Sequence, residues 1–359
     1  MKRELIDETN KAIIFSNKVY FPGAVWVGSY ITYLKTIAEM KCLFLTASSV
    51  YKILQEPLRE ILVLGEGNII FVDEEPTIQM QEAFLQKLDH DLPDIVLAIG
   101  GGSVLDLAKS LRVQRSYDLV VIPTTPCTGT ETNPYAVLRN RDGQKTAIYS
   151  KRLLPDAVIL DAGLLATIEK RQFGYFLMDG MAHCIEALVS KRASAFSDSF
   201  ALEGFRLFRD YYQLLDLPYP KSVLEKIQTA GFFGGCAQGM ASVGLVHAFA
   251  HYFGGRYRIS HARAVAMFLR DVIAQNSSRT DRYKKLEQVS LKTSLEAMIS
   301  SAMDFFDLSD EQIPVEHSFR IDEAAEAIQK DVCSLTNPVR WRNEEVIELI
   351  KKKILISNE

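Results

Sequence analysis

Four histidines and one aspartate recur at a spacing that restricts what this 359-residue chain can build. Asp179 and His183 are four residues apart in one stretch of helical character, and His247 and His251 are four apart in another. His261 follows a short break that contains two glycines. Because a four-residue step places two side chains on one helix face, about 5–6 Å apart at Cβ, two helices could direct a carboxylate and imidazoles to one point. The spacing therefore predicts a metal site, with a donor set that suits Fe²⁺ or Zn²⁺.

Either pair taken alone has a simpler interpretation. An Asp-x-x-x-His pair is commonly a surface hydrogen bond or a helix cap, and His-x-x-x-His is only somewhat more suggestive of a ligand set. The spacing also leaves open which imidazoles would bind, because His251 is as good a partner for His247 as His261 is. If one coordination position were left for a substrate, the ion would act as a Lewis acid rather than as a structural clip.

A second, independent motif is a short apolar run, Asp94–Ala98, that is typical of a fully buried strand. It continues through Ile99 into three glycines and a serine and then into a helical stretch; the residues of interest are Gly100, Gly101, Gly102, Ser103 and Asp106. A strand, glycines and a helix start form a geometry in which backbone N–H groups and the helix dipole bind phosphate. Neither the common dinucleotide fingerprint nor the NTPase loop is matched, so a plain strand–helix connector is the alternative.

A third cluster follows another strand-like run, Leu119–Ile122. It contains four threonines around Gly129, of which Thr124, Thr125 and Thr128 are the candidate ligand contacts. Their hydroxyl and backbone donors would lie near the same ligand edge as the glycines. A serine- and threonine-rich turn is the alternative.

Composition narrows the class of protein. A hydrophobic content of 48% and a charged content of 24% are ordinary for a globular protein, and a net charge of −4 offers no basic footprint for nucleic acid. The first eight residues are mostly polar and contain no apolar h-region, which argues against a secretory signal, and no apolar run reaches the length of a membrane span. The five cysteines are odd in number and scattered singly, which predicts a reducing cytoplasm rather than a disulfide framework.

The chain is long enough for two domains, and its patterning changes near residue 163. Residues 1–163 alternate strand-like and helical stretches, which predicts a mostly parallel α/β domain; the expected strands are Cys42–Thr46, Asn68–Val72, Ile95–Ile99, Leu119–Ile122 and Ala157–Leu160. Residues 164–359 lack strand-like runs, which predicts an all-helical domain; the expected helices cover 164–189, 197–215, 221–253, 261–275, 292–306, 322–334 and 343–355, with loops at 276–291 and 307–321.

With these motifs, the chain resembles the iron-containing, family III alcohol dehydrogenases of the dehydroquinate synthase-like superfamily. The resemblance runs over nearly the whole chain, and it includes the glycine motif, the threonine cluster and the metal spacing. Lys145 and the segment Leu154–Asp161 are similar to the strand pair that closes the family's first domain, and Asp331-Val332-Cys333 with Asn337-Pro338 is similar to its closing motif.

The resemblance implies a Rossmann-like N-terminal domain, a helical C-terminal domain, and a homodimer. It assigns Asp179, His183, His247 and His261 to the metal, and it places His251 beside the nicotinamide. It assigns NAD or NADP to the glycine motif and the threonines, with Lys145 at the ribose. The implied activity is the metal-dependent interconversion of an alcohol and an aldehyde or ketone by hydride transfer, in a cleft between the two domains.

Two other functions fit parts of the pattern. A cyclase or lyase of the dehydroquinate synthase type also uses NAD and a metal, but that branch typically binds zinc through one carboxylate and two histidines, so His183 favours the dehydrogenase. A non-catalytic protein that binds metal and nucleotide is the other alternative.

Departures from the family pattern concern the coenzyme and the substrate. Ala47 follows the strand Cys42–Thr46 where many NAD-using members carry aspartate, so we expect NADPH to be tolerated, with Ser48 and Ser49 as donors to its phosphate. Glu75 stands where asparagine is usual. The arginines near His261, which are Arg256, Arg258 and Arg263, suggest a small anionic substrate, against the alternative that they are ordinary surface charges.

Overall fold

The computed structural model describes residues 21–61, 68–88, 92–141, 145–257, 259–289, 293–308 and 312–356. The chain divides into two compact units. The first contains the residues up to Thr125 together with Thr130–Leu164, and the second contains Pro126–Gly129 together with the chain from Leu165 onward. The main division lies one residue beyond the expected position, 163, but the segment 126–129 leaves the first unit and joins the second.

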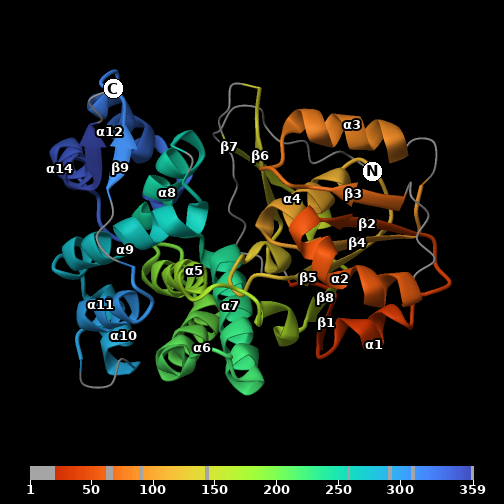
Figure 1. Cartoon of the computed structure of the whole chain (residues 1–359). Helices are drawn as coiled ribbons and strands as arrows, with labels where there is room; N and C mark the ends of the chain where they lie inside the picture. Colours follow the sequence, from red (N-terminus) through yellow and green to blue (C-terminus); the bar gives the residue numbers. More distant parts are fainter. Residues whose placement is uncertain are drawn as a thin grey trace. The chain divides into compact units, whose positions relative to one another are not determined.

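Among its described residues, the first unit contains a six-stranded sheet in the order β1-β8-β5-β4-β2-β3, in which every neighbouring pair is parallel (Figure 1). The strands are β1 (Ala24–Val27), β2 (Cys42–Thr46), β3 (Ile69–Phe71), β4 (Ile95–Gly100), β5 (Asp118–Pro123) and β8 (Ala157–Leu160). Each predicted strand is present. β1 was not predicted; it is an exposed edge strand, although its four residues are as apolar as those of β8.

The helices of this unit connect parallel strands; they are α1 (Tyr30–Leu34), α2 (Ser48–Ile61), α3 (Ile78–Leu88) and α4 (Gly102–Leu111). From β2 the chain passes through α2 outward to β3, whereas from β4 it passes through α4 in the opposite direction to β5. Because such crossovers are right-handed, α2 and α4 lie on opposite faces of the sheet, as Figure 1 shows. The strand order therefore reverses between β2 and β4, and ligands of open α/β sheets bind at such a point.

A separate antiparallel hairpin, β6 (Tyr135–Arg139) and β7 (Lys145–Tyr149), also belongs to the first unit. Lys145 and the strand at 157–160 were expected to form one closing pair. Instead, Lys145 begins β7 in the hairpin, and β8 joins the large sheet. Short 3-10 turns complete the unit; they are η2 (Thr130–Thr132), η3 (Lys151–Leu153) and η4 (Ala162–Leu165).

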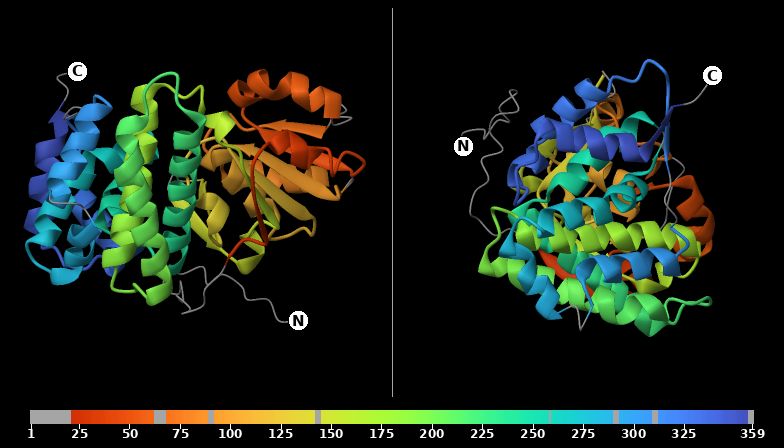
Figure 2. Two further views of the ribbon diagram at one scale, coloured as in Figure 1. Left: turned by 90° about the horizontal axis from the view of Figure 1, so that it is seen from below. Right: turned by 90° about the vertical axis from the view of Figure 1, so that its left-hand side faces the viewer.

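The second unit is mainly helical. Its helices are α5 (Lys170–Val189), α6 (Ala195–Tyr211), α7 (Lys221–Ala241), α8 (Leu245–Arg256), α9 (His261–Ser277), α10 (Lys284–Val289), α11 (Leu295–Phe305), α12 (Ile321–Lys330), α13 (Val332–Thr336) and α14 (Asn343–Lys353), with 3-10 turns η5 (Tyr212–Leu214) and η6 (Asp281–Tyr283). The long helices α5, α6 and α7 lie side by side, as the green ribbons of Figure 2 show. Their contacts form the interior of the unit.

Several local expectations for this unit were wrong. The expected helix 322–334 is two helices, α12 and α13, separated at Asp331. The stretch 221–253 is two helices rather than one, because α7 ends at Ser242, whose φ is 63°, and α8 begins after Gly244. The expected loop 276–291 contains η6 and α10, and the expected loop 307–321 contains β9 (Ile313–Val315). β9 pairs in parallel with β10 (Ile354–Ile356) in a small two-stranded sheet. Strands of three residues are too short to be recognised in the sequence.

The segment Pro126–Gly129 packs in the helical unit because glycines on two helices make room for it. A Cβ atom on Gly231 of α7 would lie 1.8 Å from the carbonyl oxygen of Pro126, and one on Gly180 of α5 would lie 2.7 Å from Sγ of Cys127. Substitution at either glycine would push this segment away. Within the described residues, no helix combines the length and the apolar character needed to cross a membrane.

Candidate metal centre and nucleotide loop

Helix α5 carries three ionisable side chains on one face. Asp179, His183 and Glu186 are separated by steps of four and three residues, which bring side chains to the same side of a helix. All three are buried. This arrangement extends the predicted Asp-x-x-x-His pair by one further carboxylate.

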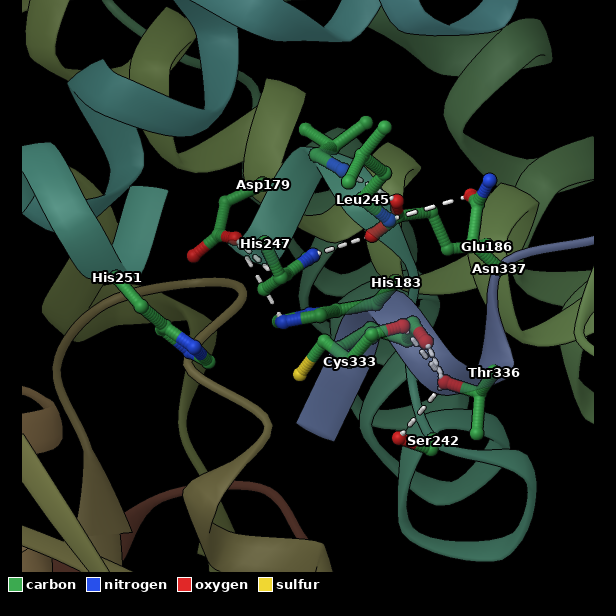
Figure 3. Close-up of polar contacts among 12 residues, drawn as sticks. Asp179, His183, Glu186, Ser242, Leu245, His247, His251, Cys333, Thr336 and Asn337 are labelled. Atoms are coloured by element: carbon green, nitrogen blue, oxygen red, sulfur yellow. Dashed lines mark hydrogen bonds and ion pairs between the residues drawn. The ribbon is translucent and has the colours of Figure 1, made fainter. Parts of the chain in front are cut away.

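The imidazoles of three helices approach one oxygen of this set. Oδ1 of Asp179 lies 3.6 Å from Nε2 of His183, 3.4 Å from Nε2 of His247 on α8, and 3.8 Å from Nε2 of His261 at the start of α9. Figure 3 shows Asp179, His183 and His247 turned toward one another. The rings of His247 and His261 are 5.4 Å apart between centroids. The four residues assigned to the metal through the family resemblance are thus brought together.

A divalent metal ion fits this arrangement. Among the described residues, Oδ1 of Asp179 and Nε2 of His247 are buried side-chain atoms without a hydrogen-bond partner, which is costly unless another group satisfies them. The separations of 3.4–3.8 Å are too long for good hydrogen bonds. Donor atoms placed tetrahedrally around an ion at about 2.1 Å lie roughly 3.4 Å apart. One carboxylate oxygen and three imidazole nitrogens suit Fe²⁺ and Zn²⁺.

The charges around the centre also favour a cation. Although burial opposes its ionisation, the neighbouring histidines hold the pKa of Asp179 well below its ordinary value. Burial lowers the pKa of His183 to about 4, which leaves its imidazole neutral near pH 7. Burial likewise disfavours charge on His247, but the carboxylates of Asp179 and Glu186 raise its pKa to about 9. The two carboxylates therefore make this buried point a place for positive charge.

The orientation of His247 is fixed by a residue that the sequence analysis did not identify. Nδ1 of His247 lies 2.6 Å from Oε2 of Glu186 (Figure 3). In the neutral form of the ring, which is the form that binds a metal, a hydrogen bond from Nδ1 to the carboxylate leaves the lone pair on Nε2, the atom that faces Asp179. A signal was present in the sequence, because Glu186 is three residues after His183 and seven after Asp179 on the same helix.

The same carboxylate also holds the beginning of α8. Oε1 of Glu186 accepts a hydrogen bond from the backbone N–H of Val246 at 2.8 Å, and Oδ1 of Asn337 accepts one from Leu245 at 3.2 Å. A Cβ atom on Gly244 would lie 2.7 Å from Oε1 of Glu186, so only glycine allows this approach. The break between α7 and α8 thus serves to bring His247 to α5.

His251 has a different partner. Its Nδ1 lies 3.0 Å from Oδ2 of Asp331, whose Oδ1 accepts a hydrogen bond from the backbone N–H of Cys333 at 2.8 Å. The His251 ring is 5.7 Å from the ring of His261 between centroids, and its side chain is 30% exposed. His251 therefore lies beside the metal residues with its Nδ1 already engaged. Asp331 is 80 residues away in the chain, and no local pattern links it to His251.

The glycine motif forms the turn between β4 and α4. Gly101 is the N-cap of α4 and has no side-chain cap, with φ of −81° and ψ of −175°, a conformation open to any residue. A Cβ atom there would have its nearest neighbour, in Thr125, at 3.5 Å, which is an ordinary contact. Neither backbone nor packing therefore requires glycine at 101. An uncapped first turn without a side chain suits the close approach of a pyrophosphate.

Gly100 has a different role from Gly101. A Cβ atom on Gly100 would lie 2.5 Å from a methyl group of Val104, so packing requires glycine at this position. The carbonyl of Gly100 accepts a hydrogen bond from the backbone N–H of Thr124, which follows β5. Gly102 and Ser103 form the first turn of α4. Thr124 and Thr125 therefore lie beside the glycine turn, as expected, whereas Thr128 belongs to the helical unit.

Asp106 and Lys109 are both buried within the first unit. Oδ1 of Asp106 accepts a hydrogen bond from the hydroxyl of Thr130, and Nζ of Lys109 donates to the carbonyl of Thr130 at 2.5 Å and to the carbonyl of Asn133 at 2.9 Å. Burial raises the pKa of Asp106 to about 6 and lowers that of Lys109 to about 8. This pair holds the chain after Gly129, a structural role that the motif had not revealed for Asp106.

Lys145 is paired with the residue that departs from the family pattern. Its Nζ lies 3.0 Å from Oε1 of Glu75, and Arg139 contacts the other oxygen of the same carboxylate. Although burial opposes its ionisation, the pKa of Glu75 is lowered by these two cations. Any contact of Lys145 with a ribose would be shared with Glu75.

Comparison with known proteins identifies the family. Residues 19–162 match the family described as iron-containing alcohol dehydrogenase, and residues 175–354 match the C-terminal domain of the same family. The chain therefore belongs to the iron-containing alcohol dehydrogenases.

Individual relatives are moderately similar in sequence. The 1-propanol dehydrogenase of Citrobacter freundii is 32% identical over 235 residues, which cover 62% of this chain and 63% of the relative. Alcohol dehydrogenase 4 of Saccharomyces cerevisiae is 27% identical over 359 residues, covering 89% of this chain and 92% of the relative. The bifunctional aldehyde-alcohol dehydrogenase of Escherichia coli K12 is 28% identical over 246 residues, which span 59% of this chain and 28% of that protein.

Solved structures support the same fold. An iron-containing alcohol dehydrogenase from Corynebacterium glutamicum superposes with a TM-score of 0.82 at 21% identity, over 96% of this chain and 97% of that chain. A 1,3-propanediol oxidoreductase superposes with a TM-score of 0.81 at 21% identity, over 94% and 99%. At this level of identity the likeness concerns the fold alone.

Proposed function

We propose that this chain is a metal-dependent, NAD(P)-linked oxidoreductase that interconverts an alcohol and an aldehyde or ketone. The convergence of three imidazole Nε2 atoms on Oδ1 of Asp179, at 3.4–3.8 Å, is the observation that carries the proposal. The names of the propanol and alcohol dehydrogenase relatives support the same reaction class.

Asp179, His183, His247 and His261 would hold the metal, which when bound supplies a Lewis acid for the substrate oxygen. Three of these side chains are at most 8% exposed, whereas His261 is 32% exposed. A substrate would therefore approach from the side of His261. Glu186 would keep the proton of His247 on Nδ1, so that Nε2 stays directed to the ion.

His251 would serve in proton transfer. With Nδ1 held by the carboxylate of Asp331, its Nε2 is the atom left to exchange a proton with the substrate hydroxyl or with a water molecule. Asp331 would act as a positioning residue, because it sets the orientation and the tautomer of the ring. Neither residue would need to bind the metal.

The first unit would hold the dinucleotide, whose nicotinamide ring accepts or donates the hydride. The backbone of Gly101–Ser103 would contact the pyrophosphate, and the threonines after β5, which lie beside that turn, would contact the phosphates as well. Lys145, together with Glu75, would contact a ribose. Lys109 and Asp106 would hold the turn that begins at Thr130 through their hydrogen bonds with that residue.

The expectation of a small anionic substrate receives less support from the structure. Arg256 is exposed and its guanidinium lies 4.7 Å from the centre of the Tyr252 ring, so it has a local partner other than an anionic substrate. Arg258 lies outside the described residues. The proposal therefore names no anionic group. The homodimer and the cytoplasmic location remain predictions.

The test is an assay of purified, metal-loaded protein with NADH or NADPH and a series of short aldehydes and ketones, followed at 340 nm. Sustained oxidation of the coenzyme, abolished by a chelator and restored by Fe²⁺ or Zn²⁺, is the expected result. A cyclase of the dehydroquinate synthase type would use NAD without net turnover, and a binding protein would show no turnover at all. Either outcome over the whole series would refute the proposal.

A further inference from the structure

A carboxylate from the segment that follows β3 contacts the residues that follow β2. Oδ1 of Asp73 accepts a hydrogen bond from the backbone N–H of Ser48 at 2.7 Å, and Oδ2 accepts one from the Ser48 hydroxyl at 2.5 Å. Asp73 is two residues beyond the end of β3, and Ser48 is the first residue of α2. Ser48, one of the two serines expected to donate to a 2′-phosphate, therefore has both its N–H and its hydroxyl engaged by a negative charge.

The register of the sheet places this carboxylate on the same edge as the glycine turn. Thr46, the last residue of β2, is the register partner of Ile99 in β4 on one side and of Phe71 in β3 on the other. Because the three strands are parallel, the residues that follow them leave the sheet at one edge. Asp73 and Ser48 thus follow strands next to the one that ends at the Gly100–Gly102 turn.

This edge is also the point where the strand order reverses, between β2 and β4. A dinucleotide with its pyrophosphate on the glycine turn directs its adenosine ribose toward the end of the adjacent strand. An acidic side chain there accepts a hydrogen bond from the ribose 2′-OH and repels a 2′-phosphate. β2 itself supplies only Ala47 at this position.

The Asp73 carboxylate has the properties of such a discriminating group. It is exposed, and its hydrogen bonds with Ser48 lower its pKa, so it is ionised near neutral pH. Each of its oxygens accepts one hydrogen bond from Ser48 and has a further lone pair for a hydroxyl donor.

We propose that Asp73 is the residue by which this protein selects NAD over NADP, in place of the acidic residue that β2 lacks. The inference rests on the proposed dinucleotide-linked function, and it replaces the expectation that Ser48 would bind a 2′-phosphate. Lys52, one turn after Ser48 on α2, is close enough to influence the charge of Asp73. Without Asp73, Ser48 and Lys52 would form a site for a 2′-phosphate.

The experiment compares wild type with Asp73→Ala and Asp73→Asn. Calorimetry gives Kd for ADP-ribose and for its 2′-phosphorylated form, and the assay at 340 nm gives kcat/KM for NADH and NADPH. We expect wild type to favour the unphosphorylated partner of each pair by about a hundredfold or more, because like charges placed together are strongly unfavourable. Both substitutions should lower that ratio at least about thirtyfold. Asp73→Asn retains an acceptor for the Ser48 N–H, so its result does not depend on losing that contact.

The controls are Glu74→Gln and the double variant Asp73→Ala with Lys52→Ala. Glu74 is the exposed neighbouring carboxylate, and its neutralisation should leave the ratio unchanged. The double variant should lose the affinity for the 2′-phosphate that the single variant gains. If Asp73→Asn bound both ADP-ribose probes more weakly by the same factor, Asp73 would serve only to cap the start of α2. That result would overturn this inference but not the proposed function. Failure of wild type to bind either probe would overturn the proposed function together with it.

Discussion

The two units differ in the part of the chain that they offer to a ligand. In the first unit the glycine turn after β4 presents backbone, and Gly101 leaves open space where a side chain would otherwise lie. In the helical unit the centre around Asp179 is made of side chains from α5, α8 and α9, of which those from α5 and α8 are buried and His261 of α9 is partly exposed. The first site depends on the absence of a side chain, and the second depends on which side chains are present.

This difference predicts that the two sites respond to different kinds of substitution. A backbone site should tolerate exchange of nearby side chains but not the addition of a Cβ atom at the contact. A side-chain site should tolerate backbone adjustment but not the loss of a donor or of the group that orients it. The experiments that follow test each half of this comparison.

The largest effect should come from removing a donor in the helical unit. In His247→Ala the centre loses one of its nitrogen ligands, and we expect metal content to fall close to zero. Activity should fall by about a thousandfold or more, because a Lewis acid contributes several kcal/mol to the transition state. Metal analysis and kcat/KM provide the measurements.

Glu186→Gln removes the charge that orients His247 while keeping every proposed ligand. The expected loss is smaller, about 10–100-fold in metal affinity. Glu203→Gln, at a carboxylate on α6 that pairs with Arg206, is the matched control and should leave metal affinity unchanged. If Glu186→Gln bound metal as tightly as wild type, the carboxylate would serve only to hold α8.

The next effect separates two adjacent glycines in the first unit. Gly101→Ala should fold with an unchanged Tm, because a Cβ atom fits there, but it should bind ADP-ribose at least about tenfold more weakly since the methyl group occupies the phosphate position. Gly100→Ala should instead lose about 1–3 kcal/mol of stability through overlap with Val104. Calorimetry and thermal unfolding distinguish the two. A Gly101→Ala protein that bound the probe like wild type would remove the glycine turn from the ligand site.

The last effect is confined to stability and concerns Asp106, a buried residue of α4. Because the pKa of Asp106 is raised to about 6, the folded state binds its proton more tightly than the unfolded state does. Its contribution to stability is therefore fully present below about pH 4 and is lost as pH rises through about 6. Relative to Asp106→Asn, wild type should lose on the order of 2 kcal/mol between pH 4 and 6.5.

Urea unfolding of both proteins across that range measures the difference. Asn retains an acceptor for the Thr130 hydroxyl, so the comparison isolates the charge. Lys109 stays protonated in this window, since its pKa of about 8 lies above it. A difference independent of pH would show that Asp106 titrates as it does in the unfolded chain.

Much of the fold followed from local patterns. The fully buried strand β4 is apolar throughout, and apolar runs of this kind also located β2, β5 and β8. The three-residue strands β9 and β10 escaped, because so few residues carry no usable periodicity. The exposed edge strand β1 was missed although its four residues are apolar. The end of α7 escaped as well, since the continuous apolar pattern concealed the positive φ of Ser242.

For the site, the sequence by itself determined which side chains could meet, because helical spacing is a local property: Asp179 and His183 share a face of α5 wherever that helix lies. Only the tertiary structure decided what each group does. It paired His247 with Glu186, 61 residues away, and His251 with Asp331, 80 residues away. It also brought Asp73 onto Ser48, 25 residues away, by the register of two parallel strands. Such contacts depend on packing and strand order, which no spacing within one element encodes.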